Sequence, residues 1–351
     1  MITDKLYDKA FEYFGTKLWK QLYDMDLFAV EFSDKEIGWC TVMGELGEHI
    51  SLAVYVGNEG LKTFYDLLGS NDENISDEQY QEISLGQNCL HCSLETKDFM
   101  FPDELKEFKS YTERTGNKIK GERRKFVHFT KYAPHCLPWY IKSKNDLSYI
   151  EQALEAAIEV SKKLSEKSKI ELGFPPDEQN EMQKTIPLLS KTKNGFEWKT
   201  IELPQEIAVP YFEPKLSDEA AEELSSFERK GTLECKVFRI PFPLEDKKNE
   251  PPRYPAILLA LDSDAGMIVS KPDFVMDDEE DLKLFDSFAD IFFDQKFLPE
   301  KIKAFDDRTV NLLKNFCLQT GTPIVVEPVR DADAAFGDML MHMGMMGMLG
   351  F

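Results

Sequence analysis

The order in which helices and strands are predicted constrains this chain more than any other feature of its sequence. Segments with apolar residues at helical spacing and segments with alternating apolar residues follow the same order in both halves. In each half, a helix and three consecutive strands precede alternating helices and strands. The two halves share no evident residue identity, so the repetition is one of topology. The consecutive strands are predicted at residues 27–33, 37–43 and 49–56, and again at 234–242, 256–263 and 267–271.

Three consecutive strands followed by alternating helices and strands predict a mixed sheet with helices packed on its faces. We therefore expect an α/β chain of two domains, each with the order β-β-β-α-β-α-β-α. This order resembles that of the ribonuclease H-like fold, so the resemblance implies such an arrangement for each domain.

Length and a change of composition predict where the domains divide. The chain of 351 residues is long for a single core, since domains usually have about 100–200 residues. Residues 1–168 are predicted as an N-terminal α/β domain, and residues 216–351 as a C-terminal α/β domain with a methionine-rich tail. Residues 169–215 are predicted as a linker with a β-hairpin, because Asn194-Gly195 lies between two strand-like runs and is a strong hairpin signal.

Charge and hydropathy exclude several classes of partner. The chain has 64 acidic and 42 basic residues, a formal net charge of −22 at pH 7. Nucleic-acid binding depends on neutralising phosphates with Lys and Arg, and anionic membranes repel an acidic protein, so neither is expected as a partner. No apolar run reaches the roughly 18–20 residues that span a bilayer. The N-terminus also lacks the apolar segment of a secretion signal, so a cytoplasmic location is expected.

Part of the sequence resembles an uncharacterised bacterial protein family. The resemblance lies in LWKQLYDMDLFAVEFSDKEIGWCTVMGELGEHISLAVYVGNEGL, residues 18–61, and in YAPHCLPW, residues 132–139. Residues 255–333 resemble the family more loosely. Its members join such an N-terminal domain to a second α/β domain of unknown function. The resemblance therefore implies two domains and carries over no activity.

The most metal-like pattern comprises Cys89 and Cys92 at CxxC spacing, followed by His135 and Cys136. Three thiolates and an imidazole could bind Zn²⁺ in a tetrahedral site. However, residues 89–95 are predicted as a strand, in which Cys89 and Cys92 point to opposite faces. No Gly or Pro bends the pair into a knuckle. We therefore expect buried core thiols and no cofactor, with a zinc site as the alternative.

Three pairs of acidic residues in the second half lie where predicted strands end or helices begin. In a ribonuclease H-like fold, carboxylates at comparable positions hold two divalent cations for phosphodiester cleavage. The match is incomplete, because the first strand of this half carries Glu234 and no Asp. Acidic residues at such places also cap helices and form turns. We expect caps and turns, with a metal site as the alternative. The six residues are Asp262, Asp264, Asp306, Asp307, Asp331 and Asp333.

One basic run stands out in this acidic chain, between a predicted helix and a predicted strand. Such a run can contact phosphate groups. We favour a solvated loop whose charges pair with acidic residues elsewhere. The run consists of Lys118, Lys120, Arg123, Arg124 and Lys125.

The C-terminal tail is rich in methionine. Phe336, Met339, Leu340 and Met343 have helical spacing, which predicts that the last helix packs through them. The glycines from Gly344 onward argue against one helix to the end. Methionine-rich surfaces are adaptable and suit partner binding. We expect the tail to be buried, either against its own domain or across a homodimer contact. Its last apolar residues are Met345, Met346, Met348, Leu349 and Phe351.

Catalytic signatures are absent from the sequence: there is no Walker loop, no GxGxxG after a strand, no GxSxG and no HExxH. The leading hypothesis is a non-catalytic cytoplasmic interaction or regulatory protein that binds a protein partner or a second copy through its tail. The alternative is a divalent-metal phosphodiesterase that uses the carboxylates of the C-terminal domain.

Overall fold

The structure is a computed structural model, and the chain divides into two units, Met1–Val209 and Pro210–Phe351. The side chains of Glu78 and of residues 344–348 are not described. The described residues are 2–47, 49–70, 75–120, 122–176, 183–205, 207, 212–245, 247, 250–270, 273–276 and 279–348.

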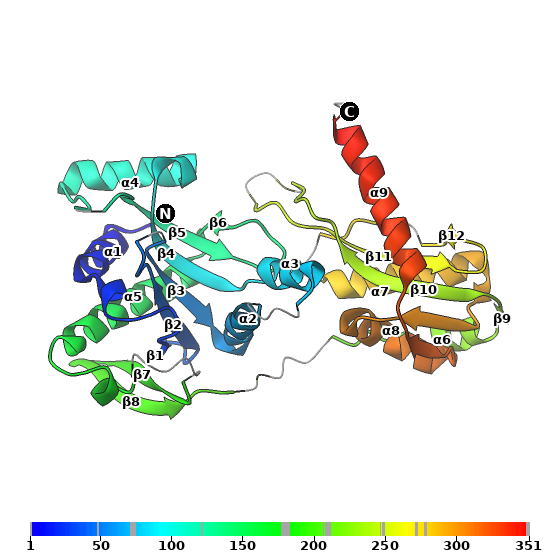
Figure 1. Cartoon of the computed structure of the whole chain (residues 1–351), viewed down its shortest axis with the longest axis horizontal. Coiled ribbons are helices and arrows are strands. Elements are labelled where there is room, and N and C mark those ends of the chain that lie inside the picture. Colours follow the sequence, from blue (N-terminus) through cyan, green and yellow to red (C-terminus); the bar gives the residue numbers. More distant parts are fainter. Residues whose placement is uncertain are drawn as a thin grey trace. The chain divides into compact units, whose positions relative to one another are not determined.

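The first unit is built on one mixed sheet, which has eight strands within the described residues, in the order β6-β5-β4-β3-β2-β1-β7-β8 (Figure 1). All neighbours in this sheet pair antiparallel except β1 and β7, which are parallel. The strands are β1 (Phe28–Glu31), β2 (Ile37–Met43), β3 (Ser51–Val56), β4 (Cys89–Glu95), β5 (Phe126–Tyr132), β6 (Trp139–Tyr140), β7 (Thr185–Thr192) and β8 (Gly195–Glu202).

Helices cover both faces of this sheet. The apolar faces of α1 and α5 pack against one face, where Phe14 and Ile150 join the largest core with Phe28 and Val54. On the opposite face, α2 packs through Leu61. The helical elements are α1 (Asp4–Thr16), η1 (Leu18–Lys20), α2 (Gly57–Gly69), α3 (Asp77–Leu85), η2 (Lys97–Phe99), α4 (Pro102–Thr115), α5 (Lys144–Leu164) and η3 (Ile170–Leu172).

Two pairings distinguish this sheet from three antiparallel strands followed by parallel ones. Strand β4 pairs with β3, and β7 pairs with β1. Helices α2 and α3 return the chain beside β3, so β4 pairs antiparallel with β3 rather than parallel with β1. The position beside β1 is occupied by β7, which follows the long helix α5. A parallel pair needs such a crossover connection. The predicted hairpin of residues 169–215 therefore supplies two strands of the first unit's sheet, and Lys193 and Asn194 form the turn between them.

The second unit has a mixed sheet of five strands within the described residues, in the order β12-β11-β10-β14-β15. The strands β10, β11 and β12 are antiparallel, while β14 pairs parallel with both β10 and β15. A separate pair, β9 and β13, is parallel. The strands are β9 (Glu228–Arg229), β10 (Thr232–Arg239), β11 (Ala256–Asp262), β12 (Met267–Ile268), β13 (Phe297–Leu298), β14 (Lys301–Ala304) and β15 (Ile324–Val326).

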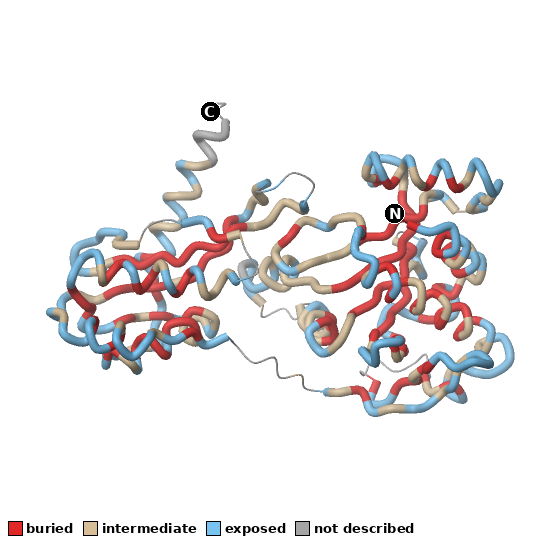
Figure 2. Tube along the Cα trace, turned by 180° about the vertical axis from the view of Figure 1, so that it is seen from behind, coloured by how far each residue is buried: buried red, intermediate tan, exposed pale blue. Residues whose placement is uncertain are grey.

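Alternation along β11 divides the core of the second unit between the two faces of its sheet. Leu258 and Ala260 face the core that contains α7 and α8. Ile257, Leu259 and Leu261 face the core that contains the start of α9. Figure 2 shows the buried residues concentrated on the strands of both units. The helices of this unit are α6 (Asp218–Ser225), α7 (Glu280–Gln295), α8 (Asp307–Thr320) and α9 (Arg330–Met348).

Candidate functional site

The four residues of the metal-like pattern are buried or partly buried in the first unit. Cys89 joins the core beneath α2, whereas Cys92 joins the core beneath α1 and α5, on the opposite face of β4. Burial raises the pKa of both thiols, so neither is an activated thiolate. His135 follows β5, and its backbone N–H donates to the carbonyl of Leu85 at 2.6 Å. Within the described residues, no group of three or more His, Cys, Asp or Glu side chains could hold a metal ion.

The carboxylates that follow the strands of the second unit form hydrogen bonds within their own turns. Asp262 Oδ1 accepts from the backbone N–H of Asp264 at 2.9 Å, at the turn after β11. Asp306 is the N-cap of α8, since it accepts from the backbone N–H and the hydroxyl of Thr309, each at 2.8 Å. Asp307 lies in the first turn of α8, where the helix dipole favours a negative charge.

Near the start of α9, the carboxylates of Glu234 and Asp333 lie beside ammonium groups. Glu234 on β10 accepts the backbone N–H of Asp331 at 2.9 Å, and thereby caps this helix. Lys303 on β14 lies 3.7 Å from the Glu234 carboxylate. Lys236 on β10 forms an ion pair with Asp333 at 2.9 Å. Backbone donors and ammonium groups therefore compensate these carboxylates, as a bound cation would.

The basic run lies mostly at the surface of the first unit. Arg124 pairs with Glu95 at 3.5 Å, so an acidic neighbour compensates one charge of the run. Glu122, which lies within this segment, pairs instead with Lys17, the C-cap residue of α1, at 3.6 Å. Four residues of the run have exposed positions: Lys118, Lys120, Arg123 and Lys125.

The methionine-rich tail begins as a packed helix. Phe336 stacks on Phe238 with ring centroids 4.1 Å apart, and Met339 and Leu340 pack against the same core. Met341 is 60% exposed, and the end of α9 extends beyond the sheet (Figure 1). The backbone remains helical to Met348.

The helix therefore continues past Gly344 to Met348, against the expectation drawn from its glycines. A glycine inside a helix costs only about 1 kcal/mol relative to alanine, and the flanking methionines are good helix formers. The side chains of Met345, Met346 and Met348, together with residues 349–351, lie outside the described residues, so their predicted burial stays a prediction.

Sequence reasoning missed a buried pair in the first unit, Glu104 and His128. Glu104 lies in the first turn of α4 and is 1% exposed. Its Oε2 accepts a hydrogen bond from Nδ1 of His128 at 2.7 Å, and its Oε1 accepts the backbone N–H of Phe129 at 3.0 Å. Since β6 has only two residues, the N–H of Phe129 lies at an open part of the β5 edge, and Glu104 closes it. In the sequence, Glu104 reads only as an acid in a first helical turn.

Other titratable groups lie on β4, which pairs with the strand β5 that carries His128. His91 is buried, and this burial lowers its pKa to about 3, so the imidazole is neutral at pH 7. Its Nε2 lies 3.4 Å from the thiol sulfur of Cys89. At the end of β4, Glu95 Oε1 lies 3.5 Å from Nδ1 of His49.

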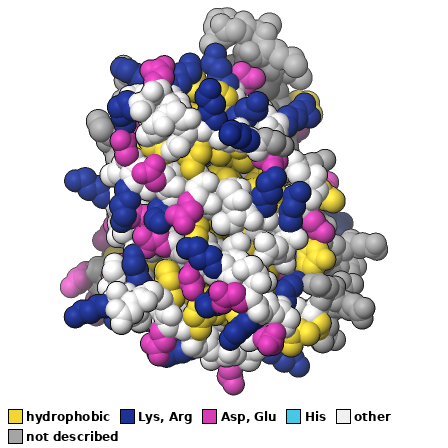
Figure 3. Space-filling model, turned by 90° about the vertical axis from the view of Figure 1, so that its left-hand side faces the viewer, with side chains coloured by type: hydrophobic (Ala, Val, Ile, Leu, Met, Phe, Trp, Pro, Cys, Tyr) yellow, Lys and Arg dark blue, Asp and Glu magenta, His cyan; other side chains and the backbone are white. Residues whose placement is uncertain are grey.

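A hollow of about 520 Å³ lies between α1, α4 and the segment that follows β6. Tyr7 lines it and stacks on Tyr111, with ring centroids 4.8 Å apart. The Tyr7 side chain is 1% exposed, and its hydroxyl has no hydrogen-bond partner within the described part of the chain. Figure 3 shows this end of the first unit, where basic and acidic side chains are interspersed around apolar ones. The hollow is therefore a candidate binding space of the first unit.

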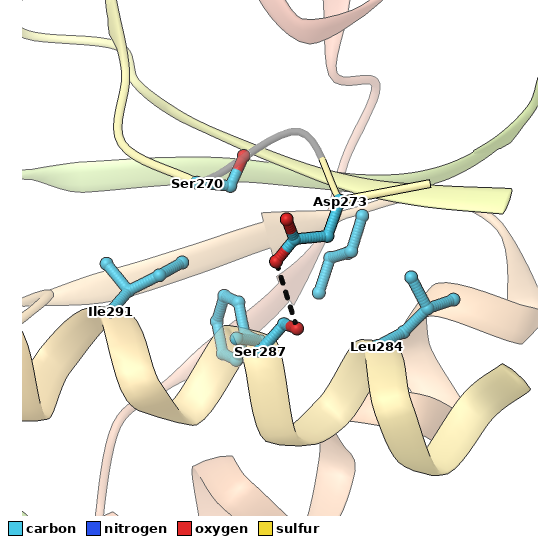
Figure 4. A pocket seen from close by; sticks show the side chains of 7 residues that line it. Ser270, Asp273, Leu284, Ser287 and Ile291 are labelled. Carbon is cyan, nitrogen blue, oxygen red and sulfur yellow. Dashed lines mark hydrogen bonds between the residues drawn. The ribbon is translucent and has the colours of Figure 1, made fainter. Parts of the chain in front are cut away.

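The second unit has a much smaller cavity, of about 10 Å³, between the sheet and α7 (Figure 4). Asp273 and Ser287 face each other there at 3.5 Å. Such a volume is about that of one water-sized probe, so this cavity is too small for a larger ligand.

Two protein families match the chain. Residues 4–182 match a family described as a domain of unknown function, DUF7309. The chain belongs to the DUF7309 family. Residues 222–340 match a second family, also described as a domain of unknown function, DUF6930. This confirms the resemblance to an uncharacterised two-domain family. No curated protein matches the sequence.

The DUF7309 segment contains the helices α1 to α5, and therefore the Glu104–His128 pair and, apart from Ile2, the lining of the hollow. The DUF6930 segment begins in α6 and ends within α9 at residue 340. Among the described side chains of α9, Leu340 is also the last that packs against the sheet core. Among the described residues, no helix has the length and apolar character needed to cross a membrane.

Proposed function

We propose that this protein is a non-catalytic interaction or regulatory protein, and that the C-terminal part of α9 binds the same helix of a second copy. This proposal rests on one observation. The apolar helix α9 continues beyond the residues that pack against the sheet of its own unit. Leu340 still packs against the sheet, whereas Met341 is 60% exposed one residue later. Large apolar side chains gathered on an exposed helix commonly mark an interaction site.

Charge favours a second copy as the occupant. Two chains of net charge −22 repel each other over most of their surfaces. Between residues 339 and 351 the sequence has no Asp, Glu, Lys or Arg. This helix end is therefore a segment where two copies can meet without bringing like charges together. A pair of identical helices related by a twofold axis would bury the same surface on both chains.

We also propose a ribonuclease H-like arrangement for the second unit. Its support is the strand order β12-β11-β10-β14-β15, with three antiparallel strands next to two parallel ones. The phosphodiesterase alternative has less support, because Lys236 pairs with Asp333, and Asp262 and Asp306 accept hydrogen bonds from their own turns. Mn²⁺-dependent phosphodiester hydrolysis that is lost in Asp331→Asn would favour that alternative.

The test is the mass of the full chain and of a variant that lacks residues 345–351. Multi-angle light scattering should give twice the chain mass of 40.5 kDa for the full chain, and the mass of a single chain for the truncated variant. Met341→Lys should weaken the dimer, whereas Asp338→Lys, a control on the same helix, should not. A full chain with the mass of one copy, unchanged in mass and stability by the truncation, would remove the support for this function.

A further inference from the structure

We propose that β8, the last strand of the first unit's sheet, pairs antiparallel with β8 of a second copy, so that the two sheets become continuous. This inference rests on the dimer proposed above and adds a second contact to it. Each contact joins identical elements, so one twofold axis can relate both. A pair of short strands is only marginally stable by itself, so the strands pair in the dimer that α9 holds together.

The outer edge of β8 is open. The strand lies at the end of the sheet, and among the described strands it pairs only with β7 (Figure 1). The backbone N–H of Leu203 donates to the carbonyl of Lys184 on the β7 side at 2.8 Å. Antiparallel neighbours alternate between hydrogen-bonded and non-hydrogen-bonded pairs, so this bond fixes which residues of β8 turn their backbone groups outward. They are Phe196, Trp198, Thr200 and Glu202.

These outward groups favour an extended polypeptide strand as the occupant. Along the edge, N–H donors and C=O acceptors alternate, and another strand presents the complementary groups at the same spacing. If the occupant is β8 of a second copy, the outward residues of one copy must pair with the outward residues of the other. This requirement leaves only a few registers for two antiparallel copies.

Charge selects one of these registers. With Trp198 on the twofold axis, Glu197 of each copy lies directly opposite Lys199 of the other. Moving the axis by one residue instead brings two copies of Lys199, or two copies of Glu197, opposite each other. Opposite charges that face each other across two strands are stabilising, whereas like charges are destabilising. The side chains of Lys199 and Glu197 are 54% and 53% exposed, so both can reach a second copy.

The local charge also favours a second copy. Residues 183–203 contain four Lys and two Glu, whereas the whole chain has a net charge of −22. Two copies can therefore meet at this hairpin without bringing their acidic surfaces together. Charged side chains on an edge strand discourage pairing with most other strands. A strand with the reversed order of charges avoids this penalty, and an antiparallel copy of β8 has that order.

Thr200→Pro tests the strand pair. The N–H of Thr200 points outward, so proline removes no hydrogen bond to β7, and such positions on edge strands tolerate proline. In the dimer, this N–H would donate to the carbonyl of Phe196 of the second copy. By analytical ultracentrifugation of the full chain, we expect the dissociation constant of the dimer to rise at least about tenfold, because both copies lose this bond. The matched control Thr200→Ala keeps the N–H and should dimerise as the wild type does.

A charge swap tests the register. Lys199→Glu places like charges opposite each other twice, and should raise the dissociation constant about fivefold to tenfold. Glu197→Lys/Lys199→Glu restores opposite charges, and should return the dissociation constant to that of the wild type. Circular dichroism of each variant ensures that a lost dimer is not lost folding.

Amide hydrogen exchange reports the strand pair directly. The backbone amides of Phe196, Trp198 and Thr200 should exchange more slowly in the full-chain dimer than in the variant that lacks residues 345–351. A full chain with the mass of one copy would refute the α9 dimer and this contact together. A dimer in which these amides exchange as fast as in the truncated chain, and which Thr200→Pro leaves intact, would overturn the β8 contact alone.

Discussion

Replacing Glu104 by alanine should strongly destabilise the first unit. The carboxylate is 1% exposed and accepts two hydrogen bonds, one from His128 at 2.7 Å and one from the backbone N–H of Phe129 at 3.0 Å. Alanine leaves both donors buried without their acceptor. Removing one partner of a buried pair typically costs about 3–5 kcal/mol. The orphaned N–H alone accounts for about 1–3 kcal/mol of that free energy.

Tryptophan fluorescence during urea unfolding measures this loss in the first unit alone. The four tryptophans of the chain, Trp19, Trp39, Trp139 and Trp198, all lie in residues 1–209. With a denaturant dependence of about 3 kcal/mol per M, a loss of about 3–5 kcal/mol lowers the urea midpoint by about 1–1.7 M. Domains are commonly stable by only about 5–15 kcal/mol, so the shift is readily measured.

Two further variants isolate the cause. Glu104→Gln keeps the shape and one acceptor oxygen, so it should cost about 1–2 kcal/mol, less than alanine. Glu113→Ala removes an exposed carboxylate from the same helix and should change stability by less than about 0.5 kcal/mol. A Glu104→Ala midpoint equal to that of Glu113→Ala would refute the assignment of this pair as a structural anchor of β5.

Two other predictions use the same assay. Burial, followed by two neighbouring histidines, lowers the pKa of His91 to about 3, below its ordinary value of about 6.5. The unfolded chain therefore binds a proton more readily, and stability should fall by up to about 1.4 kcal/mol per unit as pH falls from about 6.5 toward 3. His91→Gln should flatten this dependence of stability on pH. Equal slopes in His91→Gln and the wild type would contradict the prediction. A Cβ at Gly60 would lie 2.7 Å from the backbone of Tyr55, so Gly60→Ala should cost about 1–3 kcal/mol. Gly69→Ala, on the same helix but in open space, should be neutral or stabilising by up to about 1 kcal/mol, and equal effects would show that the contact is unimportant.

Local structure could be predicted from the sequence, because it depends on residues that are near each other in the chain. The strand predicted at residues 37–43 is β2 with the same bounds, since a short, mostly apolar run is a local signal. The Asn-Gly signal also placed the hairpin between β7 and β8, although the turn residues are Lys193 and Asn194 and Gly195 begins β8. The sequence by itself also determined that the chain is acidic and that helices and strands alternate.

Pairing between distant segments was decided only by the tertiary structure. Many strand orders are compatible with the same sequence of helices and strands. In the structure, the neighbour of β1 on one side is β7, which lies over 150 residues later in the chain. The candidate site followed the same principle. Glu104 has no sequence signal that links it to His128, because their hydrogen bond arises only where α4 meets an open edge of β5. Likewise, Glu234 caps α9 from a strand almost 100 residues earlier. Such contacts depend on which surfaces pack together, and a linear pattern of residue types does not specify that.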